Sequence, residues 1–277
     1  MIKLGLIGSG ISGSRMPRLQ TYLGRLSGVE VDYQIIDTGD NSGFSLQAEI
    51  KHREAQGYRG LNITHPYKQQ VVSLAEPISR HVATIGAMNT LLFSDDGWKG
   101  ATTDYTGFKQ GYRYRRKGQK PGRVLIAGAG GVGRAIAFAL GDLGAEHLFI
   151  FDTHAGQAKA LADALTRTGT SATMVEANAF TDIAQGSTGL VNATPLGMHK
   201  YPGSAFPTKV IRRQEWAFDA VYTPLITPFM EACQSADLEV VTGYDLWLFQ
   251  GLDAFELFTG FNVDADNARK EALSWLD

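Results

Sequence analysis

The chain has 277 residues, which is enough for two ordinary domains or one large one. A hydrophobic fraction of 44% and a charged fraction of 19% exclude a disordered protein and are typical of a soluble globular one. The formal net charge of −2 argues against nucleic acid or an anionic membrane surface as the main partner.

The single cysteine, Cys233, excludes an intramolecular disulfide and a thiolate metal cluster, and the helical spacing around it favours a buried structural thiol. No apolar stretch approaches the roughly 18 residues needed to span a membrane. The chain opens directly into a strand-like run, without the charged and apolar regions of a signal peptide. We therefore expect a cytoplasmic protein with no membrane partner and no bound metal.

Strand-like apolar runs alternate with helix-like segments over most of the chain. This alternation predicts an α/β fold with mostly parallel sheets. The predicted strands, in chain order, are Leu4–Ile7, Asp32–Ile36, Gly60–Ile63, Val124–Ala127, His147–Phe151, Gly189–Val191 and Trp216–Phe218.

The clearest break in composition is the polar turn cluster Lys117–Gly122, which precedes a new strand. We expect a substrate domain before it and a nucleotide domain after it. The last stretch, from Tyr244, is apolar at helical spacing and is expected to pack back on the first domain. The predicted domains are therefore 1–103 with 245–277 for the substrate, and 104–244 for the nucleotide.

The basic run Arg113–Lys117 has two interpretations. One is the solvated end of a helix, and the other is a patch that binds a phosphate backbone. We favour the solvated helix end, because the chain as a whole is slightly acidic.

A G-x-G-x-x-G pattern opens the expected nucleotide domain, and its residues are Gly128, Gly130, Gly131, Val132 and Gly133. It follows a predicted strand and precedes a strongly helical segment. The next strand leads into Asp152, about 20 residues beyond the last glycine, as the dinucleotide fingerprint requires. Glycines let the backbone turn tightly and approach a pyrophosphate, which lies at the positive end of the helix. We interpret this loop as a dinucleotide site.

The same pattern occurs earlier, at Gly8, Gly10 and Gly13, with Asp37 at the end of the following strand. However, Pro17 comes soon after the last glycine, and Gly24 and Gly28 interrupt the expected helix. We therefore interpret the first loop as a substrate-binding loop, although a dinucleotide loop is not excluded.

Asp152 also bears on the choice of cofactor. A carboxylate at this strand end can accept hydrogen bonds from an unmodified ribose, whereas it would repel the extra phosphate of NADP. No arginine or lysine occurs between Asp152 and Lys159. We therefore expect NAD, with NADP a weaker alternative.

Polar groups follow several apolar runs in the first part of the chain, where open α/β sheets usually bind ligands. With the later motifs, these segments resemble the signatures of the shikimate dehydrogenase family, in order over almost the whole chain. The matching segments are Gly60–Lys68, Gly86–Leu91, Thr103–Asp104, Gly128–Arg134, Asn192–Met198, Asp219–Pro224 and Gln250–Phe255.

The resemblance implies a Rossmann nucleotide domain beside an α/β substrate domain, and an oxidoreductase of the shikimate pathway of aromatic amino acid biosynthesis. It implies Lys68 and Asp104 as the pair at the reacting hydroxyl. Hydride transfer from an alcohol also releases a proton, which a positioned acid/base group must carry. The residues implied to hold the substrate are Ser14, Thr64, Asn89, Tyr222 and Gln250, and those implied near the nicotinamide are Thr194 and Gly243. Several could instead be turn or capping residues, Thr194 above all.

The sequence departs from the family pattern at the first loop. Met16 stands where a second serine usually binds the substrate carboxylate, so one contact is lost unless Arg15 replaces it. Thr102 and Tyr105 replace the usual Asn and Gly around Thr-Asp. Together with Asp152, these changes favour the NAD-preferring shikimate/quinate dehydrogenase-like members.

The expected partner is thus a small ring hydroxy acid: shikimate, quinate or a close analogue. The expected assembly is a monomer or homodimer. Two alternatives remain open: another two-domain NAD dehydrogenase, and a weakly catalytic, ligand-sensing member of the same fold. The trio Lys68, Asn89 and Asp104 argues against the first, and the retention of both Lys68 and Asp104 argues against the second.

Overall fold

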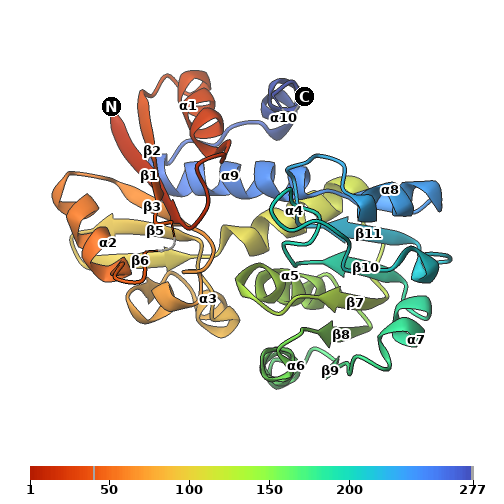
Figure 1. The fold of residues 1–277 in the computed structure, drawn as a ribbon. Helices are drawn as coiled ribbons and strands as arrows, with labels where there is room; N and C mark the ends of the chain where they lie inside the picture. The colour runs from red at the N-terminus through yellow and green to blue at the C-terminus, as the bar shows by residue number, and fades with distance from the viewer. Residues whose placement is uncertain (40, 276–277) are drawn as a thin grey trace. The chain divides into compact units, whose positions relative to one another are not determined.

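The computed structural model describes residues 1–39 and 41–275, which form two compact units (Figure 1). The first unit comprises Met1–Thr103 together with the chain from Leu248 onward, and the second comprises Asp104–Trp247. Among the described residues, no helix combines the length and the apolar character that crossing a membrane would require.

The first unit contains a mixed six-stranded sheet with the order β2-β1-β3-β5-β6-β4. Strands β1, β2 and β3 are parallel, whereas β5 runs antiparallel to both β3 and β6. The elements are β1 (Ile2–Gly8), α1 (Met16–Leu26), β2 (Val31–Asp37), α2 (Leu46–Ala55), β3 (Gly60–Ile63), a 3-10 turn (Gln70–Ser73), β4 (Glu76–Pro77), α3 (Arg80–Ile85), β5 (Thr90–Ser94), β6 (Gly97–Ala101) and α10 (Ala265–Leu273).

Helices α2 and α3 cover one face of this sheet, because their apolar side chains Leu46, Ile50 and Val82 join the core formed by Ile7, Leu61 and Ile63. Elsewhere in the unit, the backbone of Gly60 in β3 packs closely against an aromatic ring. A Cβ on Gly60 would lie 2.5 Å from the ring of Phe258, near the end of α9 (Gly243–Thr259), whose part from Leu248 onward belongs to this unit.

The second unit contains a six-stranded parallel sheet with the order β12-β11-β10-β7-β8-β9, which is a doubly wound arrangement. The elements are α4 (Thr103–Arg116), β7 (Arg123–Ala127), α5 (Gly131–Asp142), β8 (His147–Phe151), α6 (Ala155–Arg167), β9 (Ala172–Met174), α7 (Phe180–Gln185), β10 (Gly189–Asn192), a 3-10 turn (Thr208–Val210), β11 (Trp216–Asp219), α8 (Pro228–Ser235), β12 (Glu239–Val241) and α9 (Gly243–Thr259).

Both faces of the parallel sheet are covered, as its apolar strands require. On one face, Phe180 of α7 and Phe229 of α8 pack with Leu125 and Leu190 of the sheet. Cys233 belongs to the same core and is buried, which confirms the expected structural thiol. On α4, the rings of Phe108 and Tyr112 meet Phe218 and Trp216 of β11 edge-on, with centroids 4.9 and 5.1 Å apart.

All seven predicted strands are present, and the prediction of an α/β fold with a doubly wound nucleotide unit is confirmed. The antiparallel hairpin of β5 and β6 was not predicted, nor were the short strands β4, β9 and β12. The polar cluster Lys117–Gly122 separates α4 from β7 inside the second unit, so this cluster does not mark the boundary between the units.

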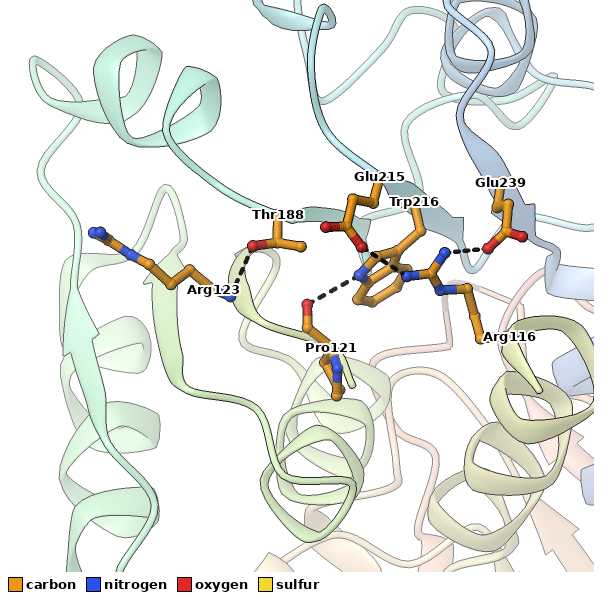
Figure 2. A network of polar contacts seen from close by, with 7 residues as sticks. All are labelled: Arg116, Pro121, Arg123, Thr188, Glu215, Trp216 and Glu239. Carbon is orange, nitrogen blue, oxygen red and sulfur yellow. Dashed lines mark hydrogen bonds and ion pairs between the residues drawn. The ribbon is translucent and has the colours of Figure 1, made fainter. Parts of the chain in front are cut away.

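The interpretation of Arg113–Lys117 as a solvated helix end is wrong at Arg116, whose side chain is only 2% exposed. Figure 2 shows its guanidinium between two carboxylates. Nη2 donates to Glu215 over 3.1 Å, and Nη1 donates to Glu239. Glu215 precedes β11 and Glu239 begins β12, so this charge network lies at the amino ends of the strands. Its neighbour Arg115 pairs with the buried Asp245 over 2.9 Å.

We predict that replacing both Glu215 and Glu239 by glutamine lowers the free energy of unfolding by about 3–5 kcal/mol, because a buried guanidinium is left without compensating charge. Urea denaturation measures this change. The control is Asp163→Asn, which breaks the exposed pair of Asp163 with Lys159 and should cost under about 0.5 kcal/mol. A double variant that loses no more than this control would show that Arg116 does not depend on the two carboxylates.

Candidate functional site

The strand order of the second unit reverses at β7, which lies between β8 and β10. In open α/β sheets, ligands bind outside the carboxyl ends of the strands at such a reversal. The loop Gly128–Gly130 directly follows β7, and α5 begins at Gly131 with Val132 in its first turn. The positive end of this helix is therefore available to an anionic group at the reversal.

The three glycines that define the G-x-G-x-x-G pattern, two in this loop and one in the first turn of α5, differ in what requires them. Gly128 has φ +104°, a conformation that other residues rarely adopt, and a Cβ there would lie 2.7 Å from the carbonyl oxygen of Ala193. A Cβ on Gly133 would lie 2.0 Å from the carbonyl oxygen of Gly128. Gly130 is the N-cap of α5 at φ −70°, and a Cβ there would meet nothing within 4 Å. Neither the protein's packing nor its backbone requires glycine at position 130, whereas close approach of a ligand would.

Asp152 comes directly after β8 and connects to this loop. Its Oδ2 accepts a hydrogen bond from the backbone N–H of Ala129 over 2.8 Å, and its Oδ1 accepts one from His154 N–H over 2.8 Å. Because a carboxylate oxygen has more than one acceptor position, both oxygens can still accept a ribose hydroxyl. The residues at this reversal therefore fit a dinucleotide whose adenosine ribose is unmodified.

The loops after β10 and β11 contain two more of the predicted positions, Thr194 and Tyr222, and a third, Gly243, follows β12. Thr194 donates its hydroxyl to Asn192 Oδ1 over 2.7 Å and accepts from Leu196 N–H over 3.2 Å, so the hydroxyl does act within a turn. Tyr222 stacks on Trp247, with ring centroids 5.9 Å apart. Gly243 begins α9, and a Cβ there would lie 2.5 Å from the carbonyl oxygen of Val221.

These loops are joined by a carboxylate that the sequence analysis did not single out. Asp219 ends β11 and is fully buried. Its Oδ1 accepts from Asn192 Nδ2 over 2.9 Å and from Val221 N–H over 3.0 Å, and its Oδ2 accepts from the Thr227 hydroxyl over 2.5 Å. Burial raises the pKa of Asp219 to about 6, against the lowering effect of these hydrogen bonds. A polar residue at the end of an apolar strand is the one sequence signal that could have identified it.

In the first unit, a buried polar cluster forms around Asn89, which lies just before β5. Asn89 Nδ2 donates to Thr103 Oγ1 over 2.9 Å and to Gln250 Oε1 over 3.3 Å, while Asn89 Oδ1 accepts from Thr103 N–H over 2.6 Å. Asn62 of β3 extends the cluster through Thr90, over 3.1 Å. The structure thus brings together Asn89 and Gln250, two predicted substrate residues far apart in the sequence.

Thr64 and Lys68 lie in the turn after β3, which starts where the Thr64 N–H donates to Ile7 O over 2.9 Å. The backbone carbonyl of Lys68 accepts from Met88 N–H over 2.8 Å, so this turn is tied to the segment before Asn89. The side chain of Lys68 is buried, as is that of Asp104 in the first turn of α4. Lys68 belongs to the first unit and Asp104 to the second, so their pairing stays a prediction.

Tyr105 follows Asp104 and replaces the glycine of the family pattern. Its hydroxyl donates to Asp142, the last residue of α5, and accepts from Lys109 Nζ over 2.9 Å. Burial, followed by the contact with Asp142, raises the pKa of the Tyr105 hydroxyl. These contacts hold the added side chain inside the second unit.

The first glycine loop is closed on itself by Asp37. The carboxylate accepts backbone N–H groups of Gly10, Ile11 and Ser12, over 2.8, 2.8 and 2.9 Å. Although burial opposes the effect, hydrogen bonds from Gly39 and these loop residues lower the pKa of Asp37. The N–H groups that would bind a pyrophosphate are therefore taken, which argues against a second dinucleotide loop.

This loop ends at the segment that contains Ser14, Arg15 and Met16. Ser14 Oγ accepts from Met16 N–H over 3.3 Å. Met16 is buried, with its sulfur 3.6 Å from Gln20 Nε2. One guanidinium nitrogen of Arg15, Nη1, is buried and has no hydrogen-bond partner among the described residues. A buried donor of this kind suits an anionic ligand.

The doubly wound sheet and its glycine loop define a dinucleotide-binding protein of the Rossmann class. Residues 6–91 match the model of the shikimate dehydrogenase substrate binding domain. The chain is 37% identical to a quinate/shikimate dehydrogenase (NAD(+)) from Corynebacterium efficiens, over 99% of this chain and 98% of that protein. It is 35% identical to a shikimate dehydrogenase (NADP(+)) from Streptomyces avermitilis, over 95% and 91%. The chain belongs to the shikimate dehydrogenase family.

A solved structure supports the same relationship. The quinate dehydrogenase from Corynebacterium glutamicum, in complex with NAD, superposes with a TM-score of 0.90 at 36% identity, and the match covers 99% of each chain. The resemblance identified from the sequence motifs is therefore confirmed for the family and for the fold.

We predict that Gly130→Ala weakens NAD binding about tenfold or more while the melting temperature stays near that of the unmodified protein, because the added methyl group meets only the ligand. Gly133→Ala should instead lower the melting temperature as well, because its methyl group collides with the Gly128 carbonyl oxygen. Calorimetric titration with NAD and thermal unfolding measure the two effects. Gly156→Ala in α6, with nothing within 4 Å, is the control. Normal NAD affinity in Gly130→Ala would contradict the assignment of this loop.

Proposed function

We propose that this protein is an NAD-dependent dehydrogenase that interconverts an alcohol and a ketone on shikimate, quinate or a closely related ring acid. The observation that carries the proposal is the match over 99% of the chain to a quinate/shikimate dehydrogenase (NAD(+)). Lys68 and Asp104, the pair that the sequence motifs imply, are both buried, which supports it. The Asn89 cluster supports it, because amide and hydroxyl groups suit the ring hydroxyls of such a substrate.

Lys68 and Asp104 are the proposed acid/base pair. NAD, when bound, supplies the hydride acceptor. Lys68 takes up the proton of the reacting hydroxyl, and its ammonium form stabilises the negative charge that develops on that oxygen. Asp104 is proposed to keep the lysine oriented toward the reacting hydroxyl. Ser14, Thr64, Asn89, Tyr222 and Gln250 are the proposed substrate contacts.

The second unit is proposed to hold NAD through two groups of residues. Gly128, Gly130, Gly131, Val132 and Gly133 hold the pyrophosphate, and Asp152 holds the adenosine ribose. Thr194 and Gly243 lie on the other half of the parallel sheet, where a dinucleotide that crosses the reversal places its nicotinamide.

Lys68→Ala should lower kcat about 10²–10⁴-fold with shikimate or quinate and NAD, because a positioned acid/base group is lost. NAD affinity should stay near normal, since Lys68 lies outside the dinucleotide unit. The control is Lys51→Ala on the exposed side of α2, which removes the same side chain without effect. Near-normal kcat in Lys68→Ala would remove Lys68 from the mechanism. An unmodified protein that binds a ring acid but turns over none, with either cofactor, would favour the ligand-sensing alternative.

For the cofactor, we predict that NAD gives a higher kcat/KM than NADP, because Asp152 repels the 2′-phosphate. Asp152→Ser combined with His154→Arg should narrow or reverse this preference, since the new guanidinium can bind that phosphate. Steady-state kinetics with both cofactors measure the ratio. The single variant His154→Ala, which leaves the carboxylate in place, should keep it. If the unmodified protein uses NADP better, a cation elsewhere must reach the phosphate.

For the substrate carboxylate, we predict that Arg15 is the anchor and that Met16 takes no part. Arg15→Ala should raise KM for shikimate or quinate about tenfold to a hundredfold or more, the value of a lost hydrogen bond to a charged group. Met16→Ser should not improve KM, because Met16 is packed against Gln20 inside the unit. Arg25→Ala, on the exposed side of α1, is the control. A KM that falls in Met16→Ser and stays constant in Arg15→Ala would reverse this assignment.

A further inference from the structure

Two loops of the parallel sheet are tied together by a fully connected polar network around Asn192 and Asp219, which we call the Asn192–Asp219 clamp. Asn192 ends β10 and Asp219 ends β11, and their side chains are hydrogen-bonded over 2.9 Å. Both side chains are fully buried. Burying a carboxylate costs desolvation free energy, which its three hydrogen-bond donors offset. Such a satisfied polar network fixes the geometry around it more tightly than apolar contacts would.

Each side of the clamp holds a different loop. Asn192 Oδ1 accepts the backbone N–H and the hydroxyl of Thr194, over 3.0 and 2.7 Å, and Asn192 Nδ2 donates to the carbonyl of Leu196 over 3.0 Å. Asp219 accepts from the N–H of Val221 and from the hydroxyl of Thr227, which caps α8. A change at either residue therefore shifts both loops together.

A third segment depends on the same arrangement. The backbone of Gly243, at the start of α9, approaches the carbonyl oxygens of Ala220 and Val221 so closely that a Cβ would lie 2.7 and 2.5 Å from them. The loop that begins at Asp219 thus also sets where Gly243 can lie. The clamp thus binds Thr194 directly, holds the backbone next to Tyr222 at Val221, and reaches Gly243 through the carbonyls of Ala220 and Val221.

The clamp lies on one defined half of the sheet. Asp152 and the glycine loop follow β8 and β7, on the half that takes the adenosine side of a dinucleotide. The loops of the clamp follow β10 and β11, on the half across the reversal, which takes the nicotinamide side. The hydrogen bonds of the clamp do not run to Asp152 or to Gly130 among the described residues. The backbone of Ala193, between Asn192 and Thr194, does pack against Gly128, so the clamp meets the glycine loop only through this packing contact.

We propose that Asn192 and Asp219 are positioning residues. They fix the loops that bind the nicotinamide half of the dinucleotide and do not contribute to binding of its adenosine half. This inference rests on the proposed function. It goes beyond that function in assigning a role to two buried residues that touch no reacting atom.

The test compares NAD with ADP-ribose, which contains the adenosine and pyrophosphate parts and lacks the nicotinamide. Asp219→Ala removes the carboxylate that accepts from Asn192, Val221 and Thr227, and leaves the bonds of Asn192 to the loop after β10 in place. Asp219→Asn keeps the shape, because its amide oxygen can accept from Asn192 and Val221 while its amide nitrogen donates to the Thr227 hydroxyl. The control is Glu239→Gln, which perturbs the Arg116 network at the opposite ends of the strands. Calorimetric titration gives the Kd values, and steady-state kinetics give kcat at saturating NAD.

In Asp219→Ala we expect kcat to fall about tenfold to a hundredfold, since small misplacement of a reacting group has effects of this size. The Kd of NAD should rise relative to that of ADP-ribose, whose Kd should stay within about twofold of normal. Asp219→Asn should recover most of both losses, and Glu239→Gln should change neither. If Asp219→Ala does not fold, Asn192→Ala replaces it, because Asp219 then keeps its bonds to Val221 and Thr227.

If Asp219→Ala weakened the binding of NAD and of ADP-ribose equally, the proposal would be overturned, because the clamp would then support the unit as a whole. Unchanged kcat and unchanged Kd values would overturn it as well. Failure of the proposed function is a separate result, in which the unmodified protein turns over no ring acid. The ratio of the two Kd values would still test the clamp in that case.

Discussion

Hydrogen bonds from loop backbone N–H groups to a carboxylate at the end of a neighbouring strand are the interaction on which both units depend. Asp37 at the end of β2 holds the loop after β1, and Asp152 after β8 holds the loop after β7. Asp219 at the end of β11 is a variant of this interaction, because it accepts from the Asn192 side chain at the end of the neighbouring β10 and from the backbone N–H of Val221 in its own loop. In each case, the carboxylate satisfies polar groups that parallel strands leave at their carboxyl ends. The loops that surround the proposed ligands therefore have fixed positions.

This interaction explains why the sequence contains two glycine fingerprints with an acidic residue at similar spacing. Both belong to a strand-loop-helix-strand unit in which the second strand provides the carboxylate. They differ in how many N–H groups that carboxylate uses. Asp37 accepts three backbone N–H groups of the first glycine loop, which follows β1. Asp152 accepts one backbone N–H of the second glycine loop and leaves the other N–H groups of that loop to a ligand. Spacing alone cannot separate the two cases, because the number of bonds depends on the path of the loop.

The sequence predicts well those features that short segments determine. The parallel strands are continuous apolar runs. Gly128 and Gly133 of the glycine fingerprint are required by the local backbone, which needs a positive φ at the first and leaves no room for a Cβ at the second. The hairpin of β5 and β6 was missed because its strands alternate poorly and contain Gly97 and Gly100. The burial of Arg116 could not be predicted either, since its partners Glu215 and Glu239 follow about a hundred residues later in the chain. The Asn89–Gln250 contact was implied by family resemblance alone, because 161 residues separate the two.

The Arg116 network lies at the amino ends of β11 and β12, while the loops proposed to bind the dinucleotide follow the carboxyl ends of strands in the same sheet. The charged groups of the Arg116 network, which support folding, are thus separated by the length of the strands from the loops proposed to bind the ligand. Substitutions in the Arg116 network can therefore change the stability of the sheet at one end, while the groups proposed to bind the ligand at the other end stay in place. For protein engineering, the amino ends of β11 and β12 are accordingly the place to begin a search for more durable variants.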